Sequence, residues 1–155
     1  MNHYLVRVSA AILRPRDEVL ALRQLDRGLE RIALPGGTAD LNESLEEALV
    51  REVREETGCE VLPSDIACVA EGYNDRWSQP TLDVCFYARM QGRVQAPERL
   101  GEYIVGIEWM ALDDPSLLTF VPHVAGFKCS RRGRYVDETG AFRRKKAAWN
   151  LNGPS

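Results

Sequence analysis

The 155-residue sequence lacks the features that mark exported, membrane-spanning and repetitive proteins. No apolar run approaches the ~20 residues that a membrane helix needs. The first residues, MNHYLVRVSA, lack the basic-then-apolar pattern of a signal peptide. No internal repeat occurs, and no low-complexity tract or linker precedes about residue 130. We therefore expect a cytoplasmic protein with one folded domain and no contact with a membrane.

Cysteine is also scarce, and its spacing argues against two kinds of site. The four cysteines, Cys59, Cys68, Cys85 and Cys129, form no CxxC pair. Without such pairs the sequence predicts neither a disulfide framework nor a zinc site. Cys68 and Cys85 lie in strand-like runs, where small reduced cysteines are commonly buried. All four are expected to be free thiols.

Charge is unevenly distributed along a chain of ordinary composition, with 45% hydrophobic and 28% charged residues. Residues 128–146 contain eight basic and two acidic side chains, a local charge of +6, so the remaining residues carry −9 and the total is −3. An acidic body cannot attract a polyphosphate by bulk charge. Such a ligand would need a bound cation or a local basic patch.

Six runs of the sequence have the composition and length of β-strands. Turn-forming residues, among them Arg-Pro-Arg-Asp and Pro-Gly-Gly, separate the first three. The predicted strands lie within residues 4–14, 18–24, 31–38, 65–73, 81–90 and 102–112.

One helix is predicted from about Ser44 to Thr57. Ser44 and Glu47 have the spacing of a capping box, and Gly58 is a favourable C-terminal stop. One or two short helices are predicted within residues 113–127, capped by one of the two aspartates at its start. The order β-β-β-α-β-β-β-α indicates an α/β (α+β) fold in which helices cover a mixed β-sheet.

The helical segment REVREETG, residues 51–58, is rich in glutamate. At about 100° per residue, Glu52, Glu55 and Glu56 lie within about 80° of Leu45, on the side of the apolar stripe. Two like charges ~4 Å apart repel by about 4 kcal/mol at an effective dielectric constant of 20. Three converging carboxylates therefore need either raised pKa values or a bound cation.

The two alternatives for this segment are a metal-binding cluster and an unfavourable ion-pair face. The cluster is favoured, because a cation would also let a polyphosphate approach the acidic body. Oxygen ligands with no histidine or thiolate nearby select a hard divalent ion, Mg²⁺ first and Mn²⁺ next.

The residues around this segment resemble the signature of the Nudix hydrolase family. That signature is a glycine, five residues, a glutamate, seven residues and the sequence R-E-aliphatic-x-E-E-x-G-aliphatic. The matching positions are Gly37, Glu43, Arg51, Glu52, Val53, Glu55, Glu56, Gly58 and Cys59. Cys59 replaces the usual aliphatic residue, at a position that packs and does not react. The resemblance implies an α/β/α sandwich, a mixed sheet flanked by helices.

The resemblance also implies a metal site for Mg²⁺, with Mn²⁺ as the alternative ion. Glu52, Glu55 and Glu56 would be its ligands. The carbonyl oxygen of Gly36 would be a further ligand. Glu102 lies seven residues before Trp109, in a segment where family members often place an extra ligand or a base.

Other side chains would support catalysis or bind the substrate. Arg51 and Glu43 would form an ion pair that orients the carboxylates. Arg23, at the end of the second strand, would reach the substrate phosphates, with a surface arginine as the alternative. Tyr73 and Trp77 flank a predicted hairpin turn, where an aromatic ring could stack on a base or simply cover an edge.

Three candidates have simple structural explanations as well. Glu98 competes with Glu102 for the role of extra ligand, and either could be a solvated loop residue. His123 is most simply a surface or half-buried histidine, with a role as base as the alternative.

The resemblance implies hydrolysis of a nucleoside diphosphate linked to another group, but no secondary signature identifies the substrate. The proline expected some fifteen residues past the motif in ADP-ribose pyrophosphatases is absent, and Asn74 and Asp75 occupy that region. The chain therefore resembles the short, general type of Nudix hydrolase. For this type we expect a (d)NTP pyrophosphohydrolase that releases NMP and pyrophosphate. Cleavage of ADP-ribose or a nucleotide sugar is the alternative.

The chain is predicted to consist of a Nudix hydrolase domain, residues 1–130, and a basic C-terminal extension, residues 131–155. The extension would contain a short helix at 141–151 and be partly mobile. A different class of function is a module that binds RNA or a protein partner through residues 128–146. The complete motif would be idle in such a module, so nucleic acid is not the expected partner. A homodimer stays open.

Overall fold

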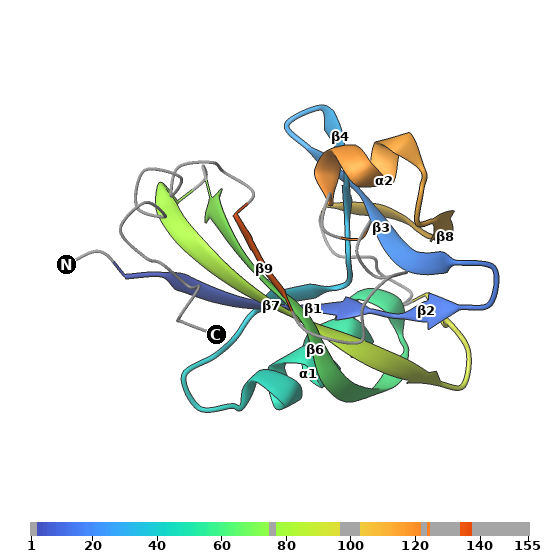
Figure 1. Cartoon of the computed structure of the whole chain (residues 1–155), viewed down its shortest axis with the longest axis horizontal. Coiled ribbons are helices and arrows are strands. Elements are labelled where there is room, and N and C mark those ends of the chain that lie inside the picture. Colours follow the sequence, from blue (N-terminus) through green and yellow to red (C-terminus); the bar gives the residue numbers. More distant parts are fainter. Residues whose placement is uncertain (1–2, 75–76, 97–102, 122–123, 125–133, 138–155) are drawn as a thin grey trace, which may run out of the picture.

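The computed structural model describes residues 3–74, 77–96, 103–121, 124 and 134–137, which form nine strands and two helices (Figure 1). The strands are β1 (Leu5–Ala11), β2 (Leu13–Arg14), β3 (Glu18–Asp26), β4 (Leu29–Ala33), β5 (Gly36–Thr38), β6 (Glu60–Asn74), β7 (Gln79–Gln91), β8 (Ile104–Ala111) and β9 (Arg134–Asp137). The helices are α1 (Leu45–Thr57) and α2 (Pro115–Phe120).

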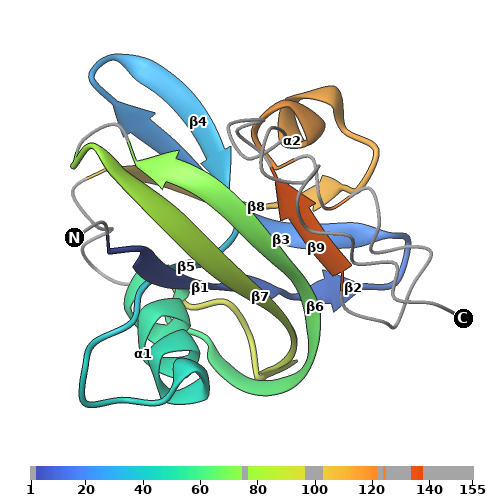
Figure 2. The same cartoon turned by 60° about the vertical axis from the view of Figure 1, so that its left-hand side comes forward.

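The strands form two sheets. Five strands make a mixed sheet in the order β5-β1-β7-β6-β9, with β1 parallel to β7 and β6 parallel to β9. The other four make an antiparallel sheet in which β3 pairs with β2, β4 and β8. Helix α1 lies against the first sheet and α2 against the second, so the sheets lie between the helices (Figures 1 and 2).

The interior consists of two apolar clusters, one beneath each helix. The cluster beneath α1 includes Leu49 of the helix and Val8 of β1. The cluster beneath α2 includes Leu117 of that helix. Strand β1 contributes Ala10 to the first cluster and Ala11 to the second, because successive residues of a strand face opposite sides of the sheet.

Local sequence determines where α1 begins and ends. The Ser44 hydroxyl accepts a hydrogen bond from the Glu47 N–H at 3.2 Å, and the Glu47 carboxylate accepts one from the Ser44 N–H at 2.7 Å. At the other end, Gly58 adopts a left-handed conformation with φ of 67°, which glycine enters without a steric penalty. The predicted capping box and stop are confirmed, and α2 begins at an aspartate cap, Asp114.

The predicted mixed-sheet fold flanked by helices is confirmed, although the strands divide between two sheets. β6 begins at Glu60, earlier than expected, because it pairs with β7 through two register shifts. β9 lies within the predicted extension and pairs with β6. The helix expected at 141–151 lies outside the described residues, and the division into domain and extension stays a prediction. No described helix is long and apolar enough to cross a membrane.

The three cysteines in the described part of the chain, Cys59, Cys68 and Cys85, are buried free thiols, as predicted. Cys68 and Cys85 are paired across β6 and β7. A hydrogen bond with Cys68 and burial raise the pKa of the Cys85 thiol, which keeps it protonated. Cys129 lies outside the described residues.

Candidate active site

Two glycines of β5 bring helix α1 close to the backbone of the sheet. A Cβ atom on Gly36, whose φ is 154°, would lie 2.1 Å from the carbonyl oxygen of Val8. A Cβ atom on Gly37 would lie 2.3 Å from the carboxylate carbon of Glu52. The Gly-Gly sequence therefore lets β5 pack against β1 and lets the Glu52 carboxylate lie directly on β5.

Glu56, one turn after Glu52 on the helix, reaches the same strand. Its Oε2 accepts a hydrogen bond from the Gly36 N–H at 2.8 Å. Burial raises the pKa of Glu56 to about 7, the negative charges of Glu52 and Glu55 add to this effect, and the Gly36 hydrogen bond opposes it. This carboxyl group therefore gains and loses a proton near neutral pH.

Arg51 joins the helix to the loop before it. Its Nε and Nη2 donate to the two carboxylate oxygens of Glu43 at 3.0 and 2.5 Å. Its Nη1 donates to Oε1 of Glu52 at 2.7 Å, and Nη2 also donates to the Thr38 carbonyl oxygen at 3.2 Å. The guanidinium lowers the pKa of Glu43 to about 2, with help from the Asp40 N–H. The predicted Arg51–Glu43 ion pair is present. It fixes the position of the Arg51 guanidinium, which donates a hydrogen bond to Glu52.

Glu55 is placed differently from the other two glutamates of the motif. Its side chain is 59% exposed, against 16% for Glu52, and its Oε2 lies 3.6 Å from Nη1 of Arg51. The helix thus turns Glu52 and Glu56 toward β5 and leaves Glu55 at the rim. Within the described residues, no three acidic, histidine or cysteine side chains are already grouped to hold a metal ion. Arg51 engages Glu52, and the Gly36 N–H engages Glu56.

Arg23 lies on β3, in the four-stranded sheet. It forms ion pairs with Glu30 of β4 and Glu108 of β8, the second at 2.6 Å between Nη2 and Oε1. Hydrogen bonds to both glutamates raise the pKa of Arg23. The sequence does not indicate these partners, because they come from separate strands and only the strand register brings them beside Arg23.

Tyr73 and Trp77 lie at the end of the β6–β7 hairpin, as predicted, where Asn74 pairs with Gln79. The two residues are 53% and 55% exposed. The Trp77 N–H donates to the Asn74 side-chain oxygen at 3.1 Å. In both views, this end of the hairpin lies above β1, and α1 lies below β1 (Figures 1 and 2).

A polar pair on the sheet was also missed. The Ser9 hydroxyl of β1 donates to Oδ1 of Asp83 on β7 at 2.9 Å, and Ser9 is buried. An aspartate within the otherwise apolar run TLDVCFY was the available signal. Ser9 pairs in register with Gly36, so the Ser9–Asp83 pair lies next to β5.

Three predicted candidates, Glu98, Glu102 and His123, lie outside the described residues. The structure therefore brings together Gly36, Gly37, Glu43, Arg51, Glu52 and Glu56. The ion pairs of Arg23 and the hairpin of Tyr73 and Trp77 belong to other parts of the sheets.

Comparison with known proteins gives a family match over most of the chain. A model of the NUDIX domain matches residues 3–128. A "MutT-like protein" from Streptomyces ambofaciens is 29% identical over 111 residues, which span 72% of this chain and 66% of that protein. The matched segment thus covers slightly less than two thirds of this relative.

Solved structures show the same fold. A NUDIX hydrolase from Nitrosomonas europaea has a TM-score of 0.67 at 23% identity, covering 81% of this chain and 91% of that one. An ADP-ribose pyrophosphatase from Streptococcus suis has a TM-score of 0.66 at 21% identity, covering 88% of this chain and 100% of that one. Because the family model matches most of its length and the motif residues meet at β5, the chain belongs to the Nudix family.

Proposed function

We propose that the protein is a cytoplasmic, Mg²⁺-dependent nucleotide pyrophosphohydrolase. It would hydrolyse a phosphoanhydride bond of a (d)NTP and release NMP and pyrophosphate. The observation that carries the proposal is the convergence of the Glu52 and Glu56 side chains on the glycines of β5. Membership of the Nudix family supports it.

The residues around β5 suit a hard divalent cation. Glu52, Glu56 and the Gly36 carbonyl would offer only oxygen atoms, which Mg²⁺ prefers. Mg²⁺ keeps several of its waters as ligands. The carboxylates of Glu52 and Glu56, with Glu55 at the rim, would therefore be enough protein ligands to bind it. The burial that disfavours a charged Glu56 would be offset by the cation. Mn²⁺ is the alternative ion.

Each side chain of the motif would then have a defined task. When bound, the metal ion would neutralise phosphate oxygens and lower the pKa of a coordinated water. Arg51, held by Glu43, would keep Glu52 in a fixed orientation. One of the glutamates of this cluster would accept a proton from that water.

Arg23, Tyr73 and Trp77 are the proposed contacts to the rest of the substrate. A phosphate would have to replace a carboxylate as partner of Arg23, which is engaged on both sides. The exposed rings of Tyr73 and Trp77 are available to stack on a base. Glu102 remains a candidate for a further ligand or base.

The second candidate function is cleavage of ADP-ribose or a nucleotide sugar. The structural likeness to the ADP-ribose pyrophosphatase favours it, at an identity that shows the fold alone. A third candidate, from another class, is an RNA- or partner-binding module that uses residues 128–146. The assembled motif favours an enzyme over such a module.

A panel of (d)NTPs, ADP-ribose and UDP-sugars with Mg²⁺ tests these alternatives. Wild type should release pyrophosphate from a (d)NTP, whereas AMP with ribose phosphate would identify the second candidate. Glu52→Gln and Glu56→Gln should be inactive, and Glu46→Gln, an exposed glutamate of the same helix, is the matched control. Turnover that survives both site substitutions would exclude this site. If no compound reacts but RNA binds with a steep salt dependence, the binding module is correct.

A further inference from the structure

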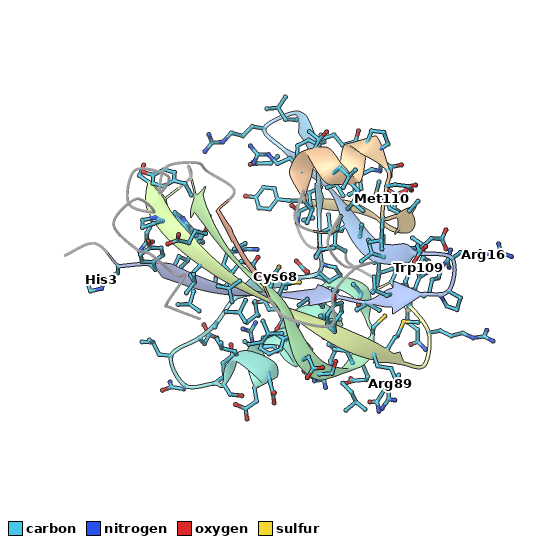
Figure 3. The ribbon with its side chains drawn as sticks, in the orientation of Figure 1. His3, Arg16, Cys68, Arg89, Trp109 and Met110 are labelled. Carbon is cyan, nitrogen blue, oxygen red and sulfur yellow. The ribbon has the colours of Figure 1, made fainter. Side chains whose placement is uncertain are left out.

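A cavity of about 620 Å³ lies where residues 11–15, the second half of β7 and Trp109 of β8 meet. Small-molecule pockets typically measure roughly 300–1,000 Å³. None of its lining residues belongs to the Nudix motif or to β5. Trp109 and Arg89 lie on the β2 side of the molecule, with His3 at the opposite end (Figure 3). No glutamate of α1 is among its described lining residues.

Among the described residues that line this cavity, the charged ones are Arg14, Arg89 and Arg93. Arg14 is engaged, because its Nε donates to Glu18 at 2.5 Å and its guanidinium lies 4.5 Å from the centroid of the Trp109 ring. Arg89 and Arg93 are exposed, and neither forms an ion pair with any residue that the structure describes. Arg89 and Arg93 therefore line the cavity without a carboxylate partner among the described residues, on a protein whose net charge is −3.

The remaining wall is largely apolar and is held in place by the fold. Ile12 is fully buried, and Trp109 packs against the same apolar cluster. The loop that carries Arg93 lies against the end of α1, since a Cβ atom on Gly58 would come within 1.7 Å of the Gln95 carbonyl oxygen. The apolar part of the wall thus belongs to the packed interior.

We propose that this Arg89–Arg93 cavity is a second binding site, for a small organic anion with a phosphate or carboxylate group on an aromatic body. Guanidinium groups bind either oxyanion through parallel hydrogen bonds. Trp109 and the stacked Arg14 guanidinium form a planar surface for the aromatic part. The site does not depend on hydrolysis and would bind without a metal ion.

Binding can be followed at Trp109 itself, by ¹⁵N NMR of the indole N–H groups in buffer with EDTA. Trp77→Phe and Trp109→Phe assign the signals. AMP is the phosphate probe and benzoate the carboxylate probe. At least one of them should shift the Trp109 signal saturably, and inorganic phosphate alone should bind at least tenfold more weakly than AMP if AMP is the ligand. If neither AMP nor benzoate shifts the Trp109 signal at millimolar concentration, the proposal is wrong.

Substitutions locate the anion. The double variant Arg89→Gln/Arg93→Gln should bind the probe at least tenfold more weakly. Arg31→Gln, an exposed arginine of β4, and Glu56→Gln should bind it as wild type does. Binding that survives the double substitution, or that Glu56→Gln abolishes, would overturn the proposal. If the double variant misfolds, the wild-type titration alone still tests the proposal. If the protein hydrolyses no nucleotide but the probe still shifts the Trp109 signal, the proposed function fails and this binding site stands.

Discussion

Arginine has opposite roles in two regions of the molecule, the α1–β5 junction and the Arg89–Arg93 cavity. The α1–β5 junction is the place where Glu52 and Glu56 meet the glycines of β5. At the junction, Arg51 is held by Glu43 and Glu52, and its charge is fully used within the protein. In the cavity, Arg89 and Arg93 have no ion-pair partner among the described residues. The partners of an arginine therefore distinguish one that supports a site from one that is available to a ligand. By the same reasoning, we expect the buried carboxylate at the junction to bind a cation and the cavity to bind an anion.

Removing the buried carboxylate of the junction should have the largest effect. Glu56→Gln keeps the size of the side chain but abolishes its charge and its capacity to take up a proton. We expect the rate of pyrophosphate release to fall by roughly 10²–10⁴-fold. Glu46→Gln, exposed on the same helix, should keep the wild-type rate. An unchanged rate in Glu56→Gln would show that the junction does not need its buried carboxylate, and the contrast with the anion-binding cavity would be lost.

The close approach of β5 to α1 can be tested by adding one methyl group. Gly37→Ala would place a Cβ atom 2.3 Å from the Glu52 carboxylate carbon, so the carboxylate must move. A displacement of about 1 Å can cost roughly 10²-fold in rate, and we expect a loss of that size in kcat/KM. Gly106→Ala is the control, because its nearest atom would lie at an ordinary 3.6 Å. Full activity in Gly37→Ala would show that the position of Glu52 is not critical.

The role of Arg51 as a support predicts a loss of stability as well as activity. Arg51→Gln leaves the half-buried Glu43 and Glu52 without their charged donor, so we expect the free energy of unfolding to fall by about 1–3 kcal/mol. Arg54→Gln removes the more exposed Arg54–Glu60 pair and should cost about 0–1 kcal/mol. Urea unfolding compares the two variants. Equal losses would mean that Arg51 is an ordinary surface arginine.

The smallest expected effect is a dependence of stability on pH. The pKa of Glu43 is lowered from 4.5 to about 2 in the folded protein, so the folded state binds fewer protons than the unfolded state in this range. The stabilising contribution is therefore complete above pH ~4.5 and is lost as the pH falls toward ~2. Between these limits, Glu43→Gln should lose less stability on acidification than wild type does. Parallel urea midpoints in the two proteins would contradict this.

The helix and its charged residues were predictable because their signals are local. The capping box, the terminal glycine and the helical periodicity of the glutamates all lie within one segment of sequence, and the structure contains each of them. The Arg51–Glu43 pair was expected from the resemblance to the Nudix signature, and the structure contains it. Glu55 is more exposed than its position on the helix implied, because β5 covers only the side that bears Glu52 and Glu56.

The partners of Arg23 and the cavity around Trp109 were not predictable, because strand register creates both. Glu30 and Glu108 reach Arg23 from two different strands. The cavity is likewise assembled from residues that lie far apart in the sequence. A single sequence contains no record of such pairings, and periodicity describes only which side of a strand each residue faces.

Mn²⁺ binding, followed by EPR as a substitute for Mg²⁺, tests whether the α1–β5 junction is a metal site. Wild type and the exposed control Glu46→Gln should bind the ion equally well. Glu56→Gln should bind it at least roughly 10–100-fold more weakly, because it loses a carboxylate that faces β5. If Glu56→Gln binds Mn²⁺ as tightly as wild type, the glutamates at β5 do not form the metal site.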